Sequence, residues 1–415
     1  MKKKMMIALS VLTALTMTLA GCGSSQAEST ATEGGAFTPS LDTSTKATLN
    51  FVGSWGNFEA LDQVALDFQK YYPDVEVVYT QLNDYRNDLS NLFATGKDID
   101  IFMSTWWDED YIGNEEAIAN AEDLSEAGLD LSNLNADMLT TGQVDGRQLM
   151  VPLYLMSWGY MINNDIFESA GVEVPTTYEE LLSACQKLKE AGYDQPVYIN
   201  SSLFGRAFIG ESMTNRLTTE DNESALEATL SYIDELYATG YFNNEGDSLE
   251  DAYEAMILRF FEGDIPIQPI CTNNFSGTKK REAKSEAYTA SPFDYSYIPI
   301  SSDENGSAFI DQLGSIYIGV YKDSEQLDLV HEFLRFMLTD EEMLTLQTIK
   351  NMPTANANNG LDTFPYLKNA NLIYTTKEGF SPVDEGCLLN ALSAYDSTSD
   401  HTAMYEKMDE YMENF

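Results

Sequence analysis

Two different spacings of apolar residues alternate along the first quarter of the chain. Residues 47–53 and 75–79 are short, strand-like runs, whereas residues 61–72 carry apolar side chains at the 3.6-residue spacing of a helix. A second helical segment ends at Thr95-Gly96, where glycine suits a helix C-terminus, and residues 99–102 form another strand-like run. Strands that alternate with helices build a parallel sheet covered by helices. The pattern therefore predicts an α/β fold.

Helical patterns are more frequent in the rest of the chain. Thr177 and Glu180 form a capping box, in which each side chain accepts a hydrogen bond from a free amide at a helix start. Amphipathic spacing predicts further helices at residues 225–237 and 251–261, and an apolar run at 313–320 predicts a strand. These segments extend the α/β pattern over the whole body of the protein.

The N-terminus has the pattern of an export signal. Lysines precede the mostly apolar stretch Met5–Ala20, which is shorter than the roughly 20 residues that a membrane span needs. Small residues then lead to Cys22, an arrangement that resembles the signal of bacterial lipoproteins. The resemblance implies that residues 1–21 are a signal peptide and that Cys22 carries a lipid such as palmitate; plain secretion is the alternative. Residues 22–46, rich in serine and threonine, are expected to be a flexible tether to the extracellular face of the cytoplasmic membrane.

Acidic residues dominate the charge, with 67 Asp and Glu against 23 Lys and Arg and a formal net charge of −44 at pH 7. This balance argues against nucleic-acid binding and against docking on lipid through a basic patch. The basic run Lys279-Lys280-Arg281 is expected to be a solvated loop. Only two histidines are present, which excludes multi-histidine zinc sites. Cys185, Cys271 and Cys387 match no metal or redox spacing, and the sequence does not choose a disulfide among them.

Four blocks of sequence carry a family resemblance. Residues 151–181 combine Val-Pro-Leu-Tyr, Met-Ile-Asn-Asn-Asp and Pro-Thr-Thr-Tyr-Glu-Glu-Leu segments, and further blocks stand at 93–102, 254–266 and 333–342. Together they resemble the extracellular solute-binding proteins of ABC importers, in the maltodextrin and oligosaccharide-binding branch. Tyr178 departs from the family pattern, because tryptophan is common there.

The resemblance implies a type II periplasmic-binding-protein-like fold, with two α/β lobes and a ligand cleft between them. The expected division is 47–156 plus 310–340 for lobe 1, and 157–309 plus 341–415 for lobe 2. The implied function is capture of a mono- or oligosaccharide by lobe closure and its delivery to the membrane subunits of an ABC permease. We further expect a monomer that needs no cofactor, catalyses no reaction and touches the membrane only through its lipid.

Candidate ligand-binding residues follow from what a sugar needs. Flat aromatic rings suit the C–H faces of a sugar, carboxylates and amides suit its hydroxyls, and loops after parallel strands are where α/β proteins bind ligands. Packing is the alternative for each tryptophan, and a solvated loop is the alternative for each acid. The first candidates are Trp55, Asn83, Tyr85, Trp106, Trp107, Asp108, Asp110, Tyr154 and Trp158.

The remaining candidates are Thr272, Asn273, Asn274, Gly314 and Ser315, at positions where relatives often carry an aromatic residue nearby. The missing aromatics weaken the expectation of a long oligosaccharide and favour polar contacts. Two other functions stay open at this point: a binder of polyamine or peptide, and a surface glycosidase with paired carboxylates. Residues 301–306 are similar to part of a calcium loop, but Gln312 stands where that loop needs glutamate.

Overall fold

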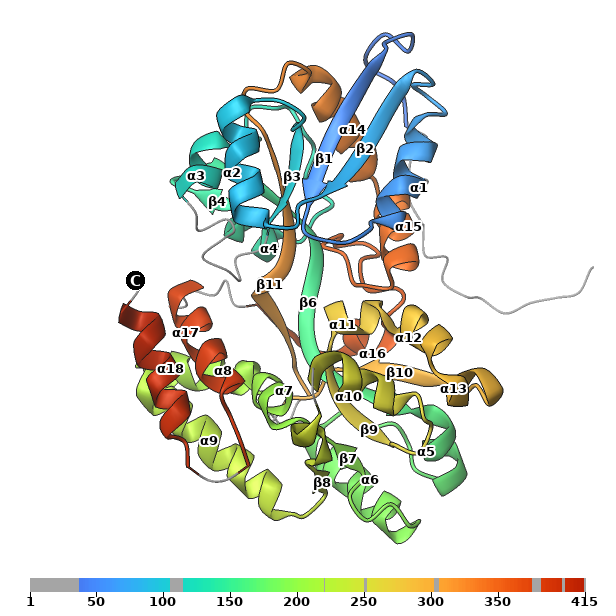
Figure 1. The fold of residues 1–415 in the computed structure, drawn as a ribbon, viewed down its shortest axis with the longest axis vertical. Coiled ribbons are helices and arrows are strands. Elements are labelled where there is room, and N and C mark those ends of the chain that lie inside the picture. The colour runs from blue at the N-terminus through green and yellow to red at the C-terminus, as the bar shows by residue number, and fades with distance from the viewer. Residues whose placement is uncertain are drawn as a thin grey trace, which may run out of the picture. The chain divides into compact units, whose positions relative to one another are not determined.

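The computed structural model describes most of the chain after residue 36 (Figure 1). The described residues are 37–104, 115–219, 221–249, 252–301, 306–374, 382–397 and 400–413. The expected signal peptide, Cys22 and the first part of the expected tether lie outside these ranges.

Most strands of the described chain join one sheet, in the order β2-β1-β3-β11-β6-β9-β7-β8, with β10 beside β6 and β12 beside β11. Parallel pairing joins β1 to β2 and β3, and β7 to β8 and β9. This confirms the α/β fold that the sequence predicts. The strands are β1 (Ala47–Gly53), β2 (Val75–Gln81), β3 (Ile101–Ser104), β6 (Met150–Asn163), β7 (Val197–Tyr198), β8 (Phe242–Asn243), β9 (Ile267–Cys271), β10 (Tyr295–Ile298), β11 (Ala308–Val320) and β12 (Leu372–Tyr374), with a separate hairpin of β4 (Gln143–Val144) and β5 (Arg147–Gln148).

Helices cover the sheet along its whole length (Figure 1). Those before β9 are α1 (Glu59–Phe68), α2 (Tyr85–Thr95), α3 (Glu115–Asn120), α4 (Ala136–Thr141), α5 (Asn164–Ala170), α6 (Tyr178–Glu190), α7 (Ser201–Arg206), α8 (Ile209–Thr219), α9 (Asn222–Ala238), the short 3-10 helix η1 (Glu245–Ser248) and α10 (Ala252–Phe260). Those after it are α11 (Thr272–Ser276), α12 (Thr278–Lys284), α13 (Glu286–Ala290), α14 (Leu327–Met337), α15 (Asp340–Lys350), α16 (Pro365–Asn369), α17 (Pro382–Ser393) and α18 (Thr402–Glu413).

Local sequence signals account for several of these boundaries. Thr177 and Glu180 form the expected capping box at the start of α6. Gly96 ends α2 in the left-handed conformation, with a φ of 63°, which glycine adopts without steric cost. The helices predicted at 225–237 and 251–261 are confirmed as α9 and α10. The basic run 279–281 is not a loop: it belongs to α12, so that expectation was wrong.

Two long strands, β6 and β11, run antiparallel to each other through the middle of the sheet (Figure 1). The first half of β6 pairs with β11, and its second half pairs with β9 and β10. Every residue of β6 is buried, which fits its nearly continuous apolar sequence. These two strands therefore connect the part of the sheet that holds β1–β3 with the part that holds β7–β10.

Two hydrophobic cores lie along the sheet. One contains Phe51 and Phe68 with α14 and α15, and the other contains Phe204 and Phe260 with most of the later helices. Met343 and Leu346 of α15 belong to the first core. We therefore propose that lobe 1 extends beyond residue 340, the limit expected from the sequence, because α15 packs on α1.

The three cysteines in the described part of the chain, Cys185, Cys271 and Cys387, are buried free thiols. Burial raises their pKa to about 12, about 11 and about 12, respectively, which keeps the thiols protonated at neutral pH. Within the described ranges, no helix combines the length and apolarity that crossing a membrane requires.

Candidate ligand-binding site

Loops that follow parallel strands meet at one edge of the β1–β3 part of the sheet. Trp55 follows β1 and is half-buried, and Asn83 follows β2 and is exposed. Residues 105–114 follow β3 and lie outside the described residues, together with the candidates Trp106, Trp107, Asp108 and Asp110. The edge where α/β proteins bind ligands thus carries Trp55 and Asn83 among its described residues.

Trp55 is held in place on several sides. Its ring packs edge-on against Phe58, with centroids 5.0 Å apart, and lies 5.6 Å from the ring of Tyr154. The backbone amide of Trp55 donates to the hydroxyl of Tyr79 at 3.0 Å. Neighbouring rings therefore fix the orientation of the half-buried indole.

A lysine from α15 lies over the same indole. The ammonium Nζ of Lys350 is 3.8 Å from the ring centroid of Trp55, a cation–π contact. Burial, with a smaller contribution from the like charge of Lys280, lowers the pKa of Lys350 to about 8. The sequence gave no sign of this contact, because 295 residues separate the two positions in the chain and neither lies in a motif.

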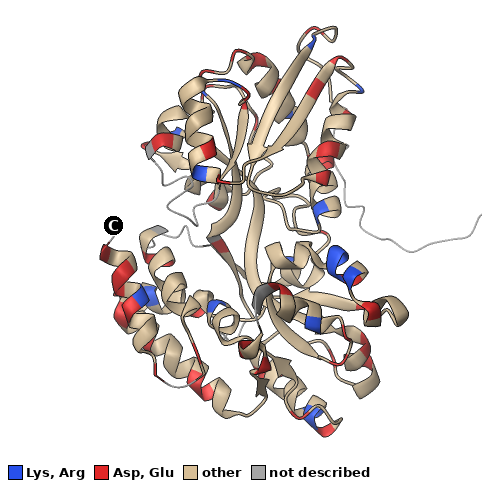
Figure 2. Cartoon of the chain, in the orientation of Figure 1, with Lys and Arg blue, Asp and Glu red and all other residues tan. Residues whose placement is uncertain are grey.

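Lysine also links α12 to the loop after β1. Lys280 Nζ donates to Asn57 Oδ1 at 2.9 Å and lies 3.6 Å from Glu59 Oε1. In the cartoon of Figure 2, much of α12 is coloured as Lys or Arg. This contact joins α12 to the loop that follows β1, and the half-buried Asn273 and Asn274 lie on α11, the helix before α12.

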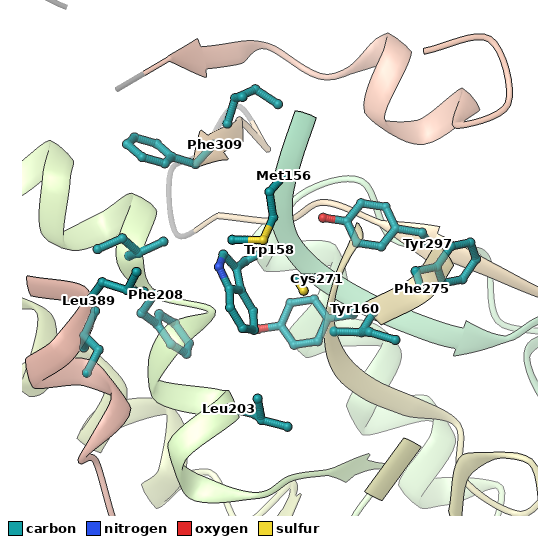
Figure 3. Packing of buried hydrophobic residues seen from close by; sticks show 14 of the residues in the cluster. Met156, Trp158, Tyr160, Leu203, Phe208, Cys271, Phe275, Tyr297, Phe309 and Leu389 are labelled. Carbon is teal, nitrogen blue, oxygen red and sulfur yellow. The ribbon is translucent and has the colours of Figure 1, made fainter. Parts of the chain in front are cut away.

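Several predicted residues are buried in the strands that cross the sheet. Trp158 is 6% exposed, and its Nε1 donates to Asp311 Oδ2 at 3.2 Å. Tyr154 is fully buried among aromatic rings and donates to the carbonyl of Leu346 at 3.3 Å. Tyr85 is also buried, and its hydroxyl donates to the carbonyl of Met103. Packing therefore accounts for Tyr154 and Tyr85, and Trp158 also lies in the hydrophobic core, beside Met156 and Tyr160 (Figure 3).

Thr272 and Ser315 bind backbone rather than solvent. Thr272 Oγ1 accepts from the amide of Ser157 and donates to the carbonyl of Leu155, both at 3.1 Å. Ser315 Oγ accepts from the amide of Met156 at 3.0 Å and donates to the Asp311 carbonyl at 2.6 Å. Both side chains are fully buried, so they fix the strands on which the site is built.

Gly314 packs closely against Met156 at the same place. A Cβ on this residue would lie 1.6 Å from Cε of Met156, far inside van der Waals contact. The glycine thus lets β11 approach β6 closely, next to the irregular pairing between Asp311 and Ile316.

Asp311, a buried polar residue beside Trp158, was not among the residues predicted from the sequence. Its side chain is fully buried, accepts from the amide of Gly314 at 2.8 Å, and also accepts from the Trp158 indole. Burial raises the pKa of this carboxyl, although hydrogen bonds, including one with Glu385, oppose the change. The sequence feature that could have indicated Asp311 is its position as the one acidic residue in the mostly apolar strand Ala308–Val320.

The described residues contain no cluster of three His, Cys, Asp or Glu side chains that could hold a metal ion. The segment proposed as part of a calcium loop falls largely at residues 302–305, outside the described residues. The candidate site consists of the indole of Trp55, side-chain amides and two lysines, which are groups that bind and orient a ligand.

Several solved structures with this fold are those of sugar-binding proteins. Apo RafE from Streptococcus pneumoniae has a TM-score of 0.65 and 14% identity, over 89% of this chain and 98% of that chain. The GacH receptor of Streptomyces glaucescens has a TM-score of 0.61 and 16% identity, over 89% and 98%. Maltose-bound MalE3 from T. maritima has a TM-score of 0.59 and 18% identity, over 89% and 100%. Among curated protein sequences, none matches this chain.

These similarities define the class of protein: a two-lobed α/β binding protein of the type II periplasmic-binding kind, with its ligand cleft between the lobes. The model of the family "Bacterial extracellular solute-binding protein" matches residues 53–344. The chain belongs to this family, and so is a solute-binding protein of ABC import. The family and fold expected from the sequence are thereby confirmed.

Proposed function

We propose that this protein captures a neutral mono- or oligosaccharide in the cleft between its lobes and delivers it to the permease of an ABC importer. The observation that carries the proposal is Trp55, a half-buried indole fixed by Phe58 at the ligand-binding edge of the sheet. An oriented aromatic ring suits the flat face of a sugar. Solved structures with the same fold include RafE in complex with raffinose and GacH in complex with acarbose.

The charges around Trp55 favour a neutral ligand over a polyamine. Lys350 lies over the indole and Lys280 reaches the adjacent loop, and together they repel a polycation. An amide at Asn83, Asn273 and Asn274 can both donate to and accept from a hydroxyl. This chemistry supports binding without catalysis, with Asp311 buried as a structural group.

A thermal-shift screen of the purified protein tests the ligand class. The ligands are maltose, raffinose, spermidine and short peptides, each also incubated with the protein to measure turnover. A ligand at 100 times its Kd stabilises the folded state by about 2.7 kcal/mol, so a sugar should raise Tm by several degrees and remain intact. A shift with spermidine or peptides alone would mean that the ligand is of that class and not a sugar. Release of reducing sugar would mean that the protein hydrolyses its ligand.

Direct binding to the Trp55→Ala and Trp55→Phe variants locates the site. We expect the alanine variant to lose affinity for the sugar about tenfold, which corresponds to about 1.4 kcal/mol, and the phenylalanine variant to lose less. Tyr193, a half-buried tyrosine away from this edge, provides the control Tyr193→Ala. If all three variants bind the sugar with equal affinity, Trp55 does not contact the ligand.

We also propose that the protein is anchored to the extracellular face of the cytoplasmic membrane by a lipid on Cys22, with residues 22–46 as a tether. Mass spectrometry of the N-terminal peptide from the membrane fraction should show a lipid-modified Cys22. The Cys22→Ser variant should leave that fraction. An unmodified, uncleaved N-terminus would contradict the anchor without affecting the proposed ligand.

A further inference from the structure

A cavity of about 440 Å³ lies beside β10, and none of the residues predicted to bind ligand lines it. Its walls come from β10, α11, α12, α13 and the segment around α16. Here it is called the β10 cavity. Pockets of about 300–1,000 Å³ hold small organic ligands, so the volume is sufficient for one.

Aromatic rings form much of the wall, and several are only half buried. Phe275 and Tyr297 pack edge-on with centroids 5.8 Å apart, and Figure 3 shows these two rings beside β6. Tyr295 and Phe293 continue the same wall, 6.2 Å apart, and Tyr366 lines the cavity from α16. Tyr295, Phe293 and Tyr366 are only half-buried, so part of each ring faces the open space of the cavity.

The polar groups of the lining are neutral or charge-compensated. Asn164 donates to Asp294 Oδ2 at 2.9 Å and accepts from Ser296 at 3.0 Å. Lys279 lies 2.8 Å from Glu282. Because one cation and one anion remain in the lining, neither sign of charge is favoured in a ligand.

We propose that the β10 cavity is a second, accessory carbohydrate site, separate from the cleft. Its rings offer flat apolar surfaces, its amide and hydroxyl groups border those surfaces, and it favours no net charge. A neutral sugar matches all of these features, because it combines apolar C–H faces with peripheral hydroxyls. A purely apolar ligand would leave the polar border unused, and an ion would gain no charge partner.

The accessory site touches the same two segments that contact the β1 loop. Lys279 lines the cavity, and its neighbour Lys280 bonds to Asn57. Asn351 lines the cavity, and its neighbour Lys350 lies over Trp55. The accessory site and the cleft region are thus adjacent but use different side chains.

Saturation-transfer NMR with maltose and with raffinose tests the proposal on the purified protein and three variants. Tyr366→Ala removes a half-buried ring of the β10 cavity, Trp55→Ala removes the indole of the cleft region, and Tyr193→Ala is the control. We expect a sugar-binding component that Tyr366→Ala weakens about fivefold or more and that Trp55→Ala leaves unchanged. Phe293→Ala should reproduce the loss if Tyr366→Ala proves unstable.

The outcomes separate the accessory site from the proposed function. Loss of all sugar binding in Trp55→Ala, with none in Tyr366→Ala or Phe293→Ala, would overturn the accessory site and leave the cleft. Binding that only the β10-cavity variants weaken would support the accessory site while contradicting Trp55 as a cleft residue. Sugar binding that no variant weakens, or no sugar binding at all, would overturn the accessory site.

Discussion

Trp158 donates its indole N–H to Oδ2 of Asp311 at 3.2 Å, and thereby links the two strands that run between the two parts of the sheet. Both residues are buried, and the amide of Gly314 completes the hydrogen bonding of the same carboxyl at 2.8 Å. A polar contact of this kind fixes the register of β6 against β11, because any slip would leave buried donors unpaired.

Removal of the Asp311 side chain should destabilise the protein. In Asp311→Ala, the Trp158 indole and the Gly314 amide lose their acceptor, so we expect the free energy of unfolding to fall by about 2–4 kcal/mol. Asp311→Asn retains an acceptor oxygen and should cost less. Urea denaturation measures both, with the exposed Asp323→Ala as control. Equal midpoints for the two alanine variants would show that the contact adds nothing.

Glu342 should make stability depend on pH. Its burial, together with the nearby charges of Asp67 and Glu341, raises its pKa to about 7. Because the pKa of Glu342 is higher in the folded state than in the unfolded state, where it is near 4.5, protonation of this carboxyl stabilises the fold. The contribution is complete below pH 4.5 and is lost as the pH rises through 7.

At pH 8, the free energy of unfolding of Glu342→Gln should therefore exceed that of the parent by about 1–3 kcal/mol, as measured by urea denaturation. This difference in free energy should be smaller at pH 5. Glu286→Gln, at an exposed position of α13 and not among the charges that raise this pKa, is the control. A difference between Glu342→Gln and the parent that stays constant from pH 5 to 8 would contradict this origin of the pH dependence.

Lys280 should tune the ammonium over Trp55. Burial is the larger cause of the low pKa of Lys350, about 8, and the charge of Lys280 is the second cause. In Lys280→Met the pKa of Lys350 should rise toward its ordinary value, as measured by NMR titration of its side-chain nitrogen. Lys284→Met, also on α12 but paired with Glu254, should leave it unchanged. A pKa that is the same in both variants would rule out this coupling.

A methyl group at position 314 should destabilise the protein, and shortening Met156 should restore part of the lost stability. Gly314→Ala places a Cβ 1.6 Å from Cε of Met156, so we expect a loss of about 1–3 kcal/mol in stability. The double variant Gly314→Ala/Met156→Ala removes the clash and should lose less than the sum of its two single variants. In contrast, Gly56→Ala meets nothing closer than 3.7 Å and should be nearly neutral. Additive losses would mean that Met156 is not the obstacle.

Local signals were enough to predict most of the fold. The capping box at Thr177, the glycine at the end of α2 and the alternation of β1, α1 and β2 depend on contacts only a few residues apart. The run 279–281 was misassigned because its charge suggested a loop, whereas α12 packs through Thr278 and leaves the lysines outside.

The candidate site was harder to predict, because its contacts join distant positions. Nothing near Trp55 in the sequence indicates Lys350, and nothing near Trp158 indicates Asp311. From the sequence, the hydroxyl of Thr272 could equally bind a ligand or the protein backbone. The structure shows that it donates a hydrogen bond to the carbonyl of Leu155. Residue type alone does not reveal which polar group is already satisfied.

Neighbouring residues of α12, Lys279 and Lys280, serve two different surfaces, and so do Lys350 and Asn351. A backbone movement at either pair would be felt at both surfaces, because the two members of each pair are adjacent in the chain. Occupancy of the β10 cavity and occupancy of the cleft would then be thermodynamically linked, and each sugar would change the affinity for the other by the same factor. A transport protein with such a linkage would respond to sugar concentration over a wider or narrower range than one site allows.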